Sequence, residues 1–512
     1  MKKIKQALIS VSNKDNLKYL IRSLKKFNIN LISSGGTYNE IKRLGFKCEE
    51  VSKYTNSAEI LSGRVKTLHP KIHAGILSNR HSKSHKKDLE KFNFKEIDLV
   101  IANFYPFEKT ISQTKNQKKI IENIDIGGPT MIRAAAKNYK YVTVITNISQ
   151  YEDLVEDMNK NNGSTSLDFR RRVALEAFGE TAYYDSLIYN YFNSISSNEF
   201  PKKIVFGFNL HEKLRYGENP HQEGAFYTSL KNSVLTKLNG KQLSYNNYLD
   251  IFAALQMSRT FPKNIGSVIV KHGNPCGVSI HKDNTKSFML AHKCDPISSF
   301  GGIVSCNFKI NKKLAIVINK LFFEVIIAKG FDKEALSILK KKNNLRLIDC
   351  KNLKMSDQKS LITNSDFALL QSQDISNFKS NNFKIVSKAK PSNKTLKNLI
   401  FAFNICRFVK SNGIVLTNEN STVGIGSGQP SRLDSCDIAI KKMKKFQNIA
   451  NKEILAASDA FFPFVDGIEK LVQNGVSAVI QPSGSIKDKE IISFANKTGI
   501  VLVFSKSRHF KH

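Results

Sequence analysis

The chain has 512 residues, of which 41% are hydrophobic and 24% are charged, a composition typical of soluble globular proteins. This length exceeds what one hydrophobic core supports, so we expect two or three domains. No stretch approaches the ~20 apolar residues of a membrane-spanning helix. The first residues read as a strand and not as a signal peptide, and we therefore expect a cytoplasmic protein with no membrane partner.

The charge is strongly positive, because 79 lysines and arginines outnumber 43 acidic residues and give a formal net charge of +36. Such an excess attracts polyanions, so a nucleic-acid-binding protein is one alternative. The lysines are spread over the whole chain, and few runs interleave basic with aromatic residues. This distribution favours a solvated surface that attracts small anionic substrates, and we predict no nucleic-acid partner.

The cysteines and histidines do not form a metal-binding pattern. The seven cysteines are an odd number and contain no Cys-x-x-Cys pair, which argues against a disulfide framework and a zinc knuckle. His69 and His73 have the spacing of helical zinc ligands, but Pro70 lies between them and no acidic ligand is close in sequence. We therefore predict reduced thiols and no metal.

The first two hundred residues alternate strand-like with helix-like segments. The predicted strands are 7–11, 29–33, 98–103 and 141–146, and the predicted helices are 16–27, 38–44 and 167–192. This alternation indicates a parallel sheet flanked by helices, and loops at the carboxyl ends of such strands collect ligand groups.

A polar, proline-bearing segment at 194–203 has the composition of a linker, so we place two domains at 1–198 and 199–512. The second domain is also predicted to be mixed α/β. Its strand-like apolar runs are 267–270, 301–306, 413–416 and 477–481. A region rich in lysine, asparagine and serine at about 340–395 is predicted to be surface or a connection between lobes.

Two turns in the first domain have the composition of phosphate-binding loops. Residues 33–37 (SSGGT) follow a strand and precede a helix, so backbone amides can approach a phosphate. Ser12 and Lys14 follow the first strand, which a doubly wound sheet would bring beside that loop. A tight turn without a ligand is the alternative.

Residues 124–137 (IDIGGPTMIRAAAK) predict a helix that begins at Pro129, with Asp125 just outside its start. Such a start attracts phosphate or carboxylate. The polar side chains predicted on one helical face, where they could point toward an anion, are those of Thr130, Arg133 and Lys137. A capped, alanine-rich core helix is the alternative. In residues 63–70, an extended backbone would place Arg64 and Lys66 on one side, where they could hold an oxyanion.

Four motifs give the first domain its family resemblance: Ser-Gly-Gly-Thr at 34–37, residues 63–70, Asn103–Phe107 and Asp125–Lys137. Together they resemble the inosine monophosphate (IMP) cyclohydrolase domain of the bifunctional purine biosynthesis proteins. The resemblance implies a methylglyoxal-synthase-like (MGS-like) fold and dehydrating ring closure of 5-formamidoimidazole-4-carboxamide ribonucleotide (FAICAR). The implied catalytic residues are Lys66 for the oxyanion, and Tyr105, Asp125 and Lys137 for orienting the amide and relaying protons. The implied substrate-binding residues are Ser12, Lys14, Ser34, Gly35, Thr37, Arg64 and Thr67.

In the second domain, a strand delivers Lys271 and His272 into a glycine- and proline-containing loop. A histidine can take a proton near neutral pH, and the adjacent cation would lower its pKa and keep it in the basic form. Considered alone, such a pair is more often structural. The Gly-x-Gly-x-Gly run at 424–428 is a weak dinucleotide signal, since no acidic residue follows at the needed distance.

Considered together, seven segments of the second domain resemble the aminoimidazolecarboxamide ribonucleotide (AICAR) formyltransferase domain of the same family. The segments that carry the resemblance are 214–222, 270–277, 295–302, 410–412, 424–432, 458–464 and 508–512. The resemblance implies cytidine-deaminase-like α/β units, nucleotide and folate substrates with 10-formyltetrahydrofolate as the formyl donor, and a homodimer. It makes His272 the base, with Lys271 in support and Asn412 holding the formyl oxygen. The implied substrate-binding residues are Arg215, Tyr216 and Arg508 for the ribonucleotide and Phe461 for the folate.

The sequence departs from the family pattern at a few positions. Pro430 stands where a larger residue is usual, and Lys329 interrupts a segment where proline is common. The Pro275-Cys276 pair lacks the Pro-Cys-x-x-Cys zinc signature of deaminases, which again indicates no metal. A protein with one active domain, the cyclase or the transferase alone, stays open as an alternative.

Overall fold

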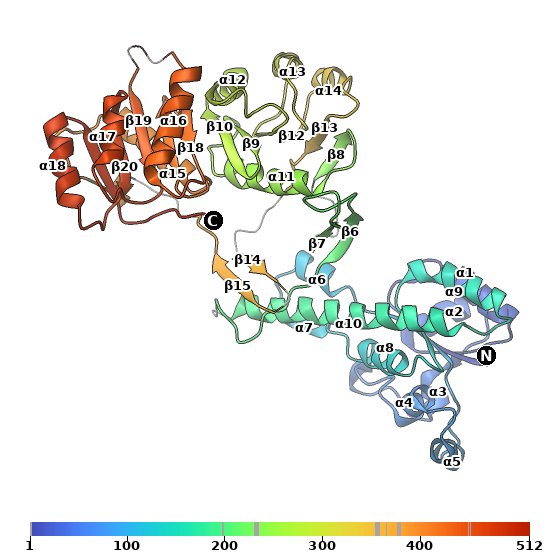
Figure 1. Cartoon of the computed structure of the whole chain (residues 1–512). Coiled ribbons are helices and arrows are strands. Elements are labelled where there is room, and N and C mark those ends of the chain that lie inside the picture. The colour runs from blue at the N-terminus through green and yellow to red at the C-terminus, as the bar shows by residue number, and fades with distance from the viewer. Residues whose placement is uncertain are drawn as a thin grey trace. The chain divides into compact units, whose positions relative to one another are not determined.

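In the computed structural model, the described residues are 3–196, 199–229, 235–353, 359–364, 366–375, 380–448, 450 and 452–512. The chain divides into two compact units, Met1–Asn209 and Leu210–His512 (Figure 1). Residues 197 and 198, at the predicted domain boundary, lie outside the described residues. None of the helices in the described ranges is long and apolar enough to cross a membrane.

The first unit is built on a five-stranded parallel sheet, which confirms the predicted parallel sheet. Its strands are β1 (Gln6–Val11), β2 (Asn30–Ser33), β3 (Glu49–Glu50), β4 (Leu99–Asn103) and β5 (Thr143–Ile145), in the order β3-β2-β1-β4-β5. Because β2 and β4 lie on opposite sides of β1, the connections diverge at β1 and leave a crevice at the carboxyl ends of β1 and β4.

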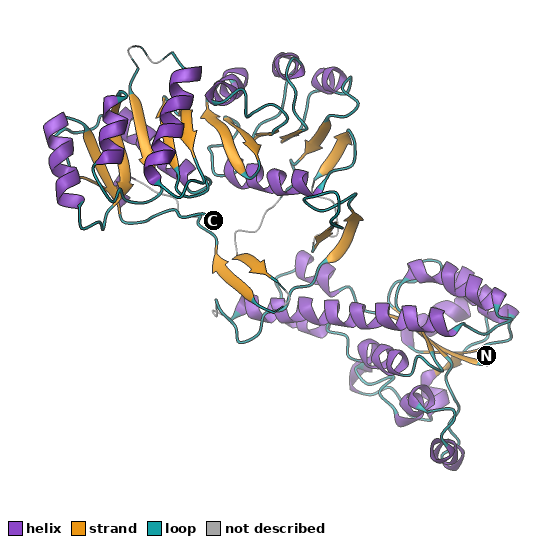
Figure 2. Cartoon of the chain, viewed as in Figure 1, coloured by secondary structure: helices purple, strands orange, loops and turns teal. Residues whose placement is uncertain are grey.

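Helices surround this sheet (Figure 2). They are α1 (Leu17–Lys26), α2 (Gly35–Arg43), α3 (Val51–Thr55), α4 (Pro70–Leu77), α5 (Lys83–Lys91), α6 (Phe107–Gln113), α7 (Gln117–Glu122), α8 (Gly127–Lys137), α9 (Tyr151–Lys160) and α10 (Leu167–Ile195). Helix α1 buries Leu17, Leu20 and Leu24, whose spacing forms one helical face. Burial of each such side chain stabilises the fold by about 1.5–3 kcal/mol.

The second unit contains a twelve-stranded sheet in the order β16-β21-β20-β19-β17-β18-β10-β9-β11-β12-β13-β8. Its strands are β8 (Thr236–Asn239), β9 (Gly266–Lys271), β10 (Asn274–Ile280), β11 (Ile303–Cys306), β12 (Val325–Ala328), β13 (Arg346–Asp349), β16 (Phe383–Ile385), β17 (Ile414–Asn418), β18 (Ser421–Gly426), β19 (Ile454–Ser458), β20 (Val476–Pro482) and β21 (Val501–Ser505). Two further pairs of strands form separate two-stranded sheets. They are β6 (Asn209–Lys213) with β7 (Ala225–Thr228) and β14 (Lys359–Thr363) with β15 (Ala368–Ser372).

The helices of this unit are α11 (Tyr245–Ser258), α12 (Asn284–Cys294), α13 (Lys312–Asn319), α14 (Lys333–Leu339), α15 (Asn393–Cys406), α16 (Arg432–Phe446), α17 (Asp466–Gln473) and α18 (Asp488–Thr498). Two lobes repeat one order of elements, a helix, a β-hairpin and three helix–strand pairs, beginning at α11 and at α15. Helices α11 and α15 share a continuous core on one sheet face. Helices α12 to α14 and α16 to α18 cover the other face with one core in each lobe.

The lobes join where β10 pairs antiparallel with β18, at Ser279 and Ser421. The antiparallel join means that the carboxyl ends of the parallel strands β19 to β21 lie on the same sheet edge as the amino ends of β11 to β13. The hairpin turn at His272 and the start of β17 also lie on this edge. One edge therefore collects loops from both lobes.

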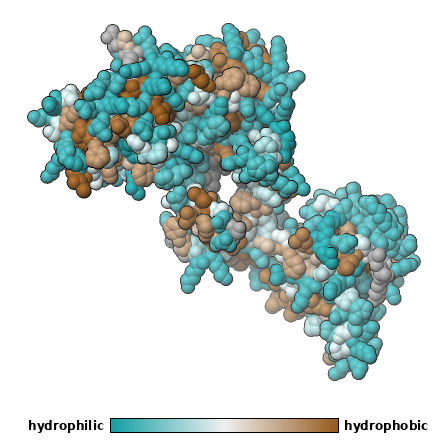
Figure 3. Space-filling view, in the orientation of Figure 1, coloured by the Kyte–Doolittle hydropathy of each residue, from teal (hydrophilic) through white to brown (hydrophobic). Residues whose placement is uncertain are grey.

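The predicted strands of this unit correspond to β9, β11, β17 and β20. The region 340–395 is only partly a connection, because Arg346–Asp349 form the sheet strand β13; residues 354–358, 365 and 376–379 lie outside the described part of the chain. Figure 3 shows that hydrophilic residues cover most of the visible face of each unit, in keeping with a solvated, lysine-rich surface.

Candidate active sites

The first unit contains a cavity of about 700 Å3 at the carboxyl ends of β1 and β4, where the sheet connections diverge. The predicted residues that line it are Ser12, Lys14, Ser34, Gly35, Thr37, Arg64, Lys66, Thr67, Tyr105 and Asp125. These residues come from five separate segments, so the fold gathers groups that are up to 113 positions apart in the sequence.

The loop after β1 is fixed by Asn103, the first residue of the 103–107 motif, to which the sequence analysis gave no role of its own. Its Oδ1 accepts from the backbone N–H of Ser12 at 2.7 Å and of Asn13 at 3.1 Å. On the other side of β1, the hydroxyl of Thr37 donates to the carbonyl of Val11 at 2.9 Å. The two strand-end loops are therefore held in place before any ligand binds.

Two lysines from different loops converge on the start of α2. A Cβ added at Gly35 would lie 3.1 Å from Nζ of Lys66, and one added at Gly36 would lie 3.6 Å from Nζ of Lys14. The first amides of a helix attract anions, and two ammonium groups reinforce that attraction. This corner of the cavity is suited to a phosphate or an oxyanion.

Both predicted cations of the 63–70 segment have carboxylate partners. Nζ of Lys66 lies 3.2 Å from Oε2 of Glu59, and Arg64 forms a two-point pair with Glu122. The backbone is not extended here, since a 3-10 turn at Leu61–Gly63 precedes the helical conformation of Arg64. The extended geometry is therefore wrong, although both side chains line the cavity.

Asp125 is a half-buried carboxylate at the cavity wall. Its Oδ1 accepts from the N–H of Gly128 at 2.9 Å, and the backbone of Gly127 and Tyr105 also favours the charged form of the carboxylate. Burial raises the pKa of Asp125 even though these bonds favour the charged form. Its own N–H donates to Oη of Tyr184 at 2.8 Å. A carboxyl group with a raised pKa can exchange protons with a substrate.

The cations predicted on α8 do not line this cavity. Helix α8 begins at Gly127, so Pro129 is its third residue and not its first, as the sequence had indicated. The guanidinium of Arg133 lies over the ring of Phe178 at 5.8 Å. Lys137 is exposed at the far end of the helix, roughly 15 Å from its start at 1.5 Å per residue. The role of Lys137 stays a prediction.

The His69 side chain, in the 63–70 segment, accepts a hydrogen bond from the backbone. Nδ1 of His69 accepts from the N–H of Lys71 at 3.1 Å and caps α4. Across the described ranges, no group of three or more histidine, cysteine, aspartate or glutamate side chains is placed to hold a metal ion.

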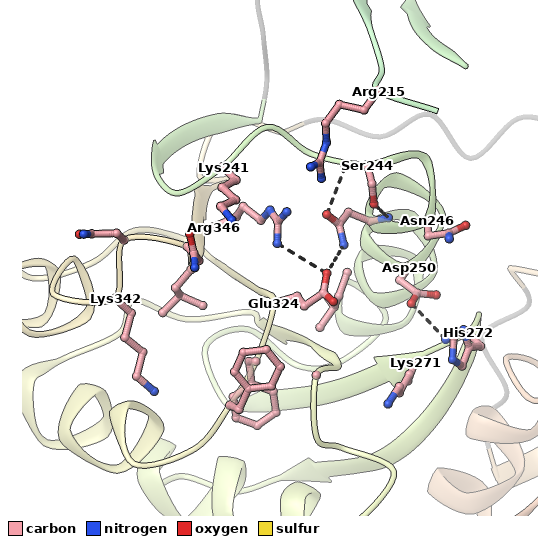
Figure 4. A pocket seen from close by; sticks show the side chains of 18 of the residues that line it. Arg215, Lys241, Ser244, Asn246, Asp250, Lys271, His272, Glu324, Lys342 and Arg346 are labelled. Carbon is pink, nitrogen blue, oxygen red and sulfur yellow. Dashed lines mark hydrogen bonds and ion pairs between the residues drawn. The ribbon is translucent and has the colours of Figure 1, made fainter. Parts of the chain in front are cut away.

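The second unit has a cavity of about 640 Å3 at the amino ends of β11 to β13 (Figure 4). It brings together four predicted residues, namely Arg215, Tyr216, Lys271 and His272. Figure 4 shows Lys271 and His272 on one side, facing the further cations Lys241, Lys342 and Arg346. The acidic residues of the lining are Asp250 and Glu324. The cations outnumber the acids, so the cavity favours an anionic ligand.

The position of His272 depends on a strained turn. His272 and Gly273 form the two-residue turn between β9 and β10, with φ of 53° and 71°. Such turns favour Asn-Gly or Asp-Gly, because other side chains tolerate positive φ poorly. The carboxylate of Asp250 on α11 accepts from the N–H of His272 at 3.0 Å and of Gly273 at 2.6 Å (Figure 4). Asp250 was not predicted, since only the folded topology brings α11 to this turn.

Lys271 and Glu324 are also held by neighbours. Nζ of Lys271 donates to the carbonyl of Phe300 at 2.7 Å. Oε2 of Glu324 accepts from Asn247 at 2.9 Å and lies 3.5 Å from Nη1 of Arg346 (Figure 4). These contacts fix the lining of the cavity.

The remaining predicted transferase residues lie in a separate cavity of about 480 Å3 in the second lobe. It is lined by Asn412, Phe461 and Arg508, at the carboxyl end of β19. Both cavities open on the same edge of the sheet. With neighbouring strands ~4.8 Å apart, the start of β17 and the turn at His272 are roughly 10–15 Å apart in one chain.

The amide of Asn412 is fully used within the protein. Its Nδ2 donates to the carbonyls of Gln429 and Pro430, each at 2.9 Å, and its Oδ1 accepts from Arg432 at 2.7 Å. Arg432 in turn pairs with the buried Asp459. In this structure Asn412 fixes Arg432 and the loop at 429–430. To donate to a formyl oxygen, the side-chain amide of Asn412 would have to give up one of its two hydrogen bonds to the carbonyls of that loop.

The two departures from the family pattern have defined places. Pro430 lines the second-lobe cavity and its carbonyl receives the Asn412 bond. The N–H of Lys329 donates to the carbonyl of Phe308 at 3.2 Å, a bond that proline could not make.

Each unit thus carries a basic cavity beside groups that can transfer protons, which defines a two-site enzyme acting on anionic small molecules. Residues 16–130 match the family model of the MGS-like domain, and residues 135–442 match that of the AICARFT/IMPCHase bienzyme. The bifunctional purine biosynthesis protein PurH of Leptospira biflexa is 44% identical over 515 residues and covers 100% of both chains. That of Persephonella marina is 43% identical and covers 99% of this chain and 100% of its own. A solved structure, ForH, is 27% identical with a TM-score of 0.34 over 37% of this chain and 99% of its own.

The chain belongs to the AICARFT/IMPCHase bienzyme family, the bifunctional purine biosynthesis proteins. It is an enzyme of purine biosynthesis with formyltransferase and cyclohydrolase activities. The family resemblance and the MGS-like first domain expected from the sequence are confirmed.

Proposed function

We propose that the first unit closes the ring of FAICAR in the cavity between β1 and β4. The carboxamide nitrogen attacks the formyl carbon, and negative charge develops on the formyl oxygen. The ammonium of Lys66, close to Gly35 at the start of α2, meets that charge. The convergence of Lys66 and Lys14 on this helix start is the observation that supports the proposal most strongly.

Proton transfer in this reaction is assigned to Asp125, with Tyr105 beside it. The attacking nitrogen loses a proton, which passes to the formyl oxygen and makes it a hydroxyl. The hydroxyl then leaves as water with the proton of the formamido nitrogen, while the ring C=N bond forms. A carboxyl group whose pKa is raised by burial can perform both transfers in turn. Ser12, Ser34 and Thr37 at the strand-end loops bind the nucleotide, with Arg64 and Thr67 on the facing loop.

In the second unit we assign formyl transfer from 10-formyltetrahydrofolate to the amine of AICAR. The amine nitrogen attacks the formyl carbon while His272 accepts a proton from that nitrogen. The tetrahedral intermediate then expels the folate nitrogen, which takes up a proton and leaves as tetrahydrofolate. Lys271 supports the charge, Arg215 and Tyr216 bind the ribonucleotide, and Phe461 with Arg508 contributes the second-lobe part of the site.

The enzyme is proposed to act as a homodimer in the cytoplasm. The dimer, with transferase sites that draw on both subunits, is what the family resemblance implies. All seven cysteines are free thiols, in keeping with a reducing compartment.

An assay with AICAR and 10-formyltetrahydrofolate tests both assignments. The wild-type protein should produce IMP without added metal. Lys66→Ala should accumulate FAICAR, whereas His272→Ala should convert supplied FAICAR to IMP but leave AICAR untouched. The assignments fail if Lys66→Ala still forms IMP at the normal rate, or if His272→Ala still formylates AICAR.

A further inference from the structure

The C-terminal segment after β21 has no regular secondary structure, yet it is firmly embedded in the second lobe. Chain ends are usually poorly ordered unless something ties them down. Here His509 is only 1% exposed, and its neighbours on both sides, Arg508 and Phe510, are exposed and line the second-lobe cavity. The segment alternates like an extended strand, so one set of side chains anchors it and the other faces the cavity.

The inward-facing residue His509 has three anchoring contacts, two of its side chain and one of its backbone. Its Nδ1 lies 2.5 Å from Oδ2 of Asp374, and its ring packs on Phe403 at 4.6 Å. Its N–H donates to the carbonyl of Asp459 at 2.8 Å. Asp459 also holds Arg432 and the N–H of Gly413, so the tail is bonded directly to the residues that shape the cavity.

Lys511 provides a second anchor at the next inward position. Its carbonyl accepts from the N–H of Ser411 at 2.9 Å, and its N–H donates to the hydroxyl of Ser411 at 3.2 Å. Ser411 precedes Asn412, which lines the same cavity. Phe510 lies between these two anchors, and Arg508 lies between β21 and the first of them, with its guanidinium over the ring of Phe510 at 4.5 Å.

Among the residues that contact His509, Asp374 lies in the connection between the two lobes, between β15 and β16. Although burial alone would raise the pKa of Asp374, its hydrogen bond to His509 and the charges of His509 and Arg407 lower it. The carboxylate is therefore maintained in the charged form, in which it accepts most strongly.

We propose that Asp374 and His509 are positioning residues for formyl transfer, which hold the C-terminal segment so that Arg508 stays in the substrate cavity. This inference rests on the proposed role of Arg508 in binding the ribonucleotide. Loss of the pair leaves the reacting groups intact but frees Arg508 to leave the cavity. The ribonucleotide then binds more weakly, while the chemical step of bound substrate changes little.

The test compares Asp374→Ala with Arg508→Ala and with Asp366→Ala, an exposed carboxylate of the same inter-lobe region. For Asp374→Ala we expect a KM for AICAR about 5- to 30-fold higher, the ratio that 1–2 kcal/mol produces, with kcat within about twofold. Asp374→Asn keeps an acceptor oxygen and should restore most of the affinity. Asp366→Ala should behave as wild type.

Release of the segment is measured separately by limited trypsin digestion and mass spectrometry, since Lys506, Arg508 and Lys511 are cleavage sites in it. Cleavage should be faster in Asp374→Ala than in the wild type and in Asp366→Ala. If Arg508→Ala raises KM but Asp374→Ala changes neither KM nor cleavage, the positioning role is wrong and the site assignment stands. If Arg508→Ala leaves KM unchanged, Arg508 does not bind the ribonucleotide. The proposal that Asp374 and His509 position Arg508 for binding is then wrong as well.

Discussion

Asp250 is predicted to control formyl transfer without contacting the substrate, because it holds the turn that carries His272. Both oxygens of its carboxylate accept backbone N–H groups of the turn. A non-glycine residue with φ of 53° costs about 1–2 kcal/mol, whereas hydrogen bonds to a charged acceptor contribute about 1.5–3 kcal/mol each. The two bonds therefore offset the strain, and the turn should relax when they are lost.

The change to make is Asp250→Ala. If the turn conformation that places His272 in the cavity becomes about 1–2 kcal/mol less stable than the relaxed conformation, the formyl-transfer rate should fall about 5- to 30-fold. Asp250→Asn keeps one acceptor and should lose less. The assay is AICAR formylation under saturating substrates, with conversion of FAICAR to IMP by the same protein as an internal reference.

A matched control is Asp283→Ala, because Asp283 also accepts two backbone N–H groups, at the start of α12 and outside the cavities described above. It should leave formyl transfer unchanged. The reasoning is refuted if Asp250→Ala retains full transferase activity, or if Asp283→Ala lowers that activity equally.

Two further predictions concern the first unit. Glu59→Gln should lower cyclohydrolase activity about 5- to 30-fold and leave formyl transfer unchanged, because the carboxylate that lies 3.2 Å from Lys66 no longer fixes its ammonium group. In the FAICAR assay, Glu59→Asp should recover part of the lost activity. Equal activity of the wild type, Glu59→Gln and Glu59→Asp would contradict this prediction. Burial raises the pKa of Asp125 above its usual 3.8, so ionising this carboxyl costs stability, and the wild type should lose stability relative to Asp125→Asn as the pH rises above about 3.8. Thermal unfolding from pH 3.5 to 8 checks it, and a Tm difference that does not change with pH would count against the raised pKa.

The fold of the first unit was predictable because its strands are short, apolar and separated by capped helices. The predicted strands at 7–11 and 98–103 coincide with β1 and β4 within one residue at each end. Their loops carry the site residues, so local sequence located most of the cavity. The orientation of α8 side chains was not predictable, since contact between Arg133 and Phe178 depends on how α10 packs.

The second unit shows where local reasoning stops. The motif at 270–277 indicated the Lys271–His272 pair, but Asp250, which bonds to the backbone of His272, lies on helix α11, and only folding brings it to the turn. The separation of Asn412 from His272 follows from the antiparallel join of two lobes at β10 and β18, which no local pattern encodes. The hydrogen bond from Arg432 to the side-chain amide of Asn412 likewise depends on tertiary packing.

The central claim is that one chain performs two reactions at two separate sites. Mixing purified Lys66→Ala with His272→Ala tests it most directly, in an assay that supplies AICAR and 10-formyltetrahydrofolate. Each variant alone should fail to form IMP, and the mixture should form it, because FAICAR made by the Lys66 variant is closed by the His272 variant. A mixture that stays inactive, with each variant lacking both activities, would contradict the account.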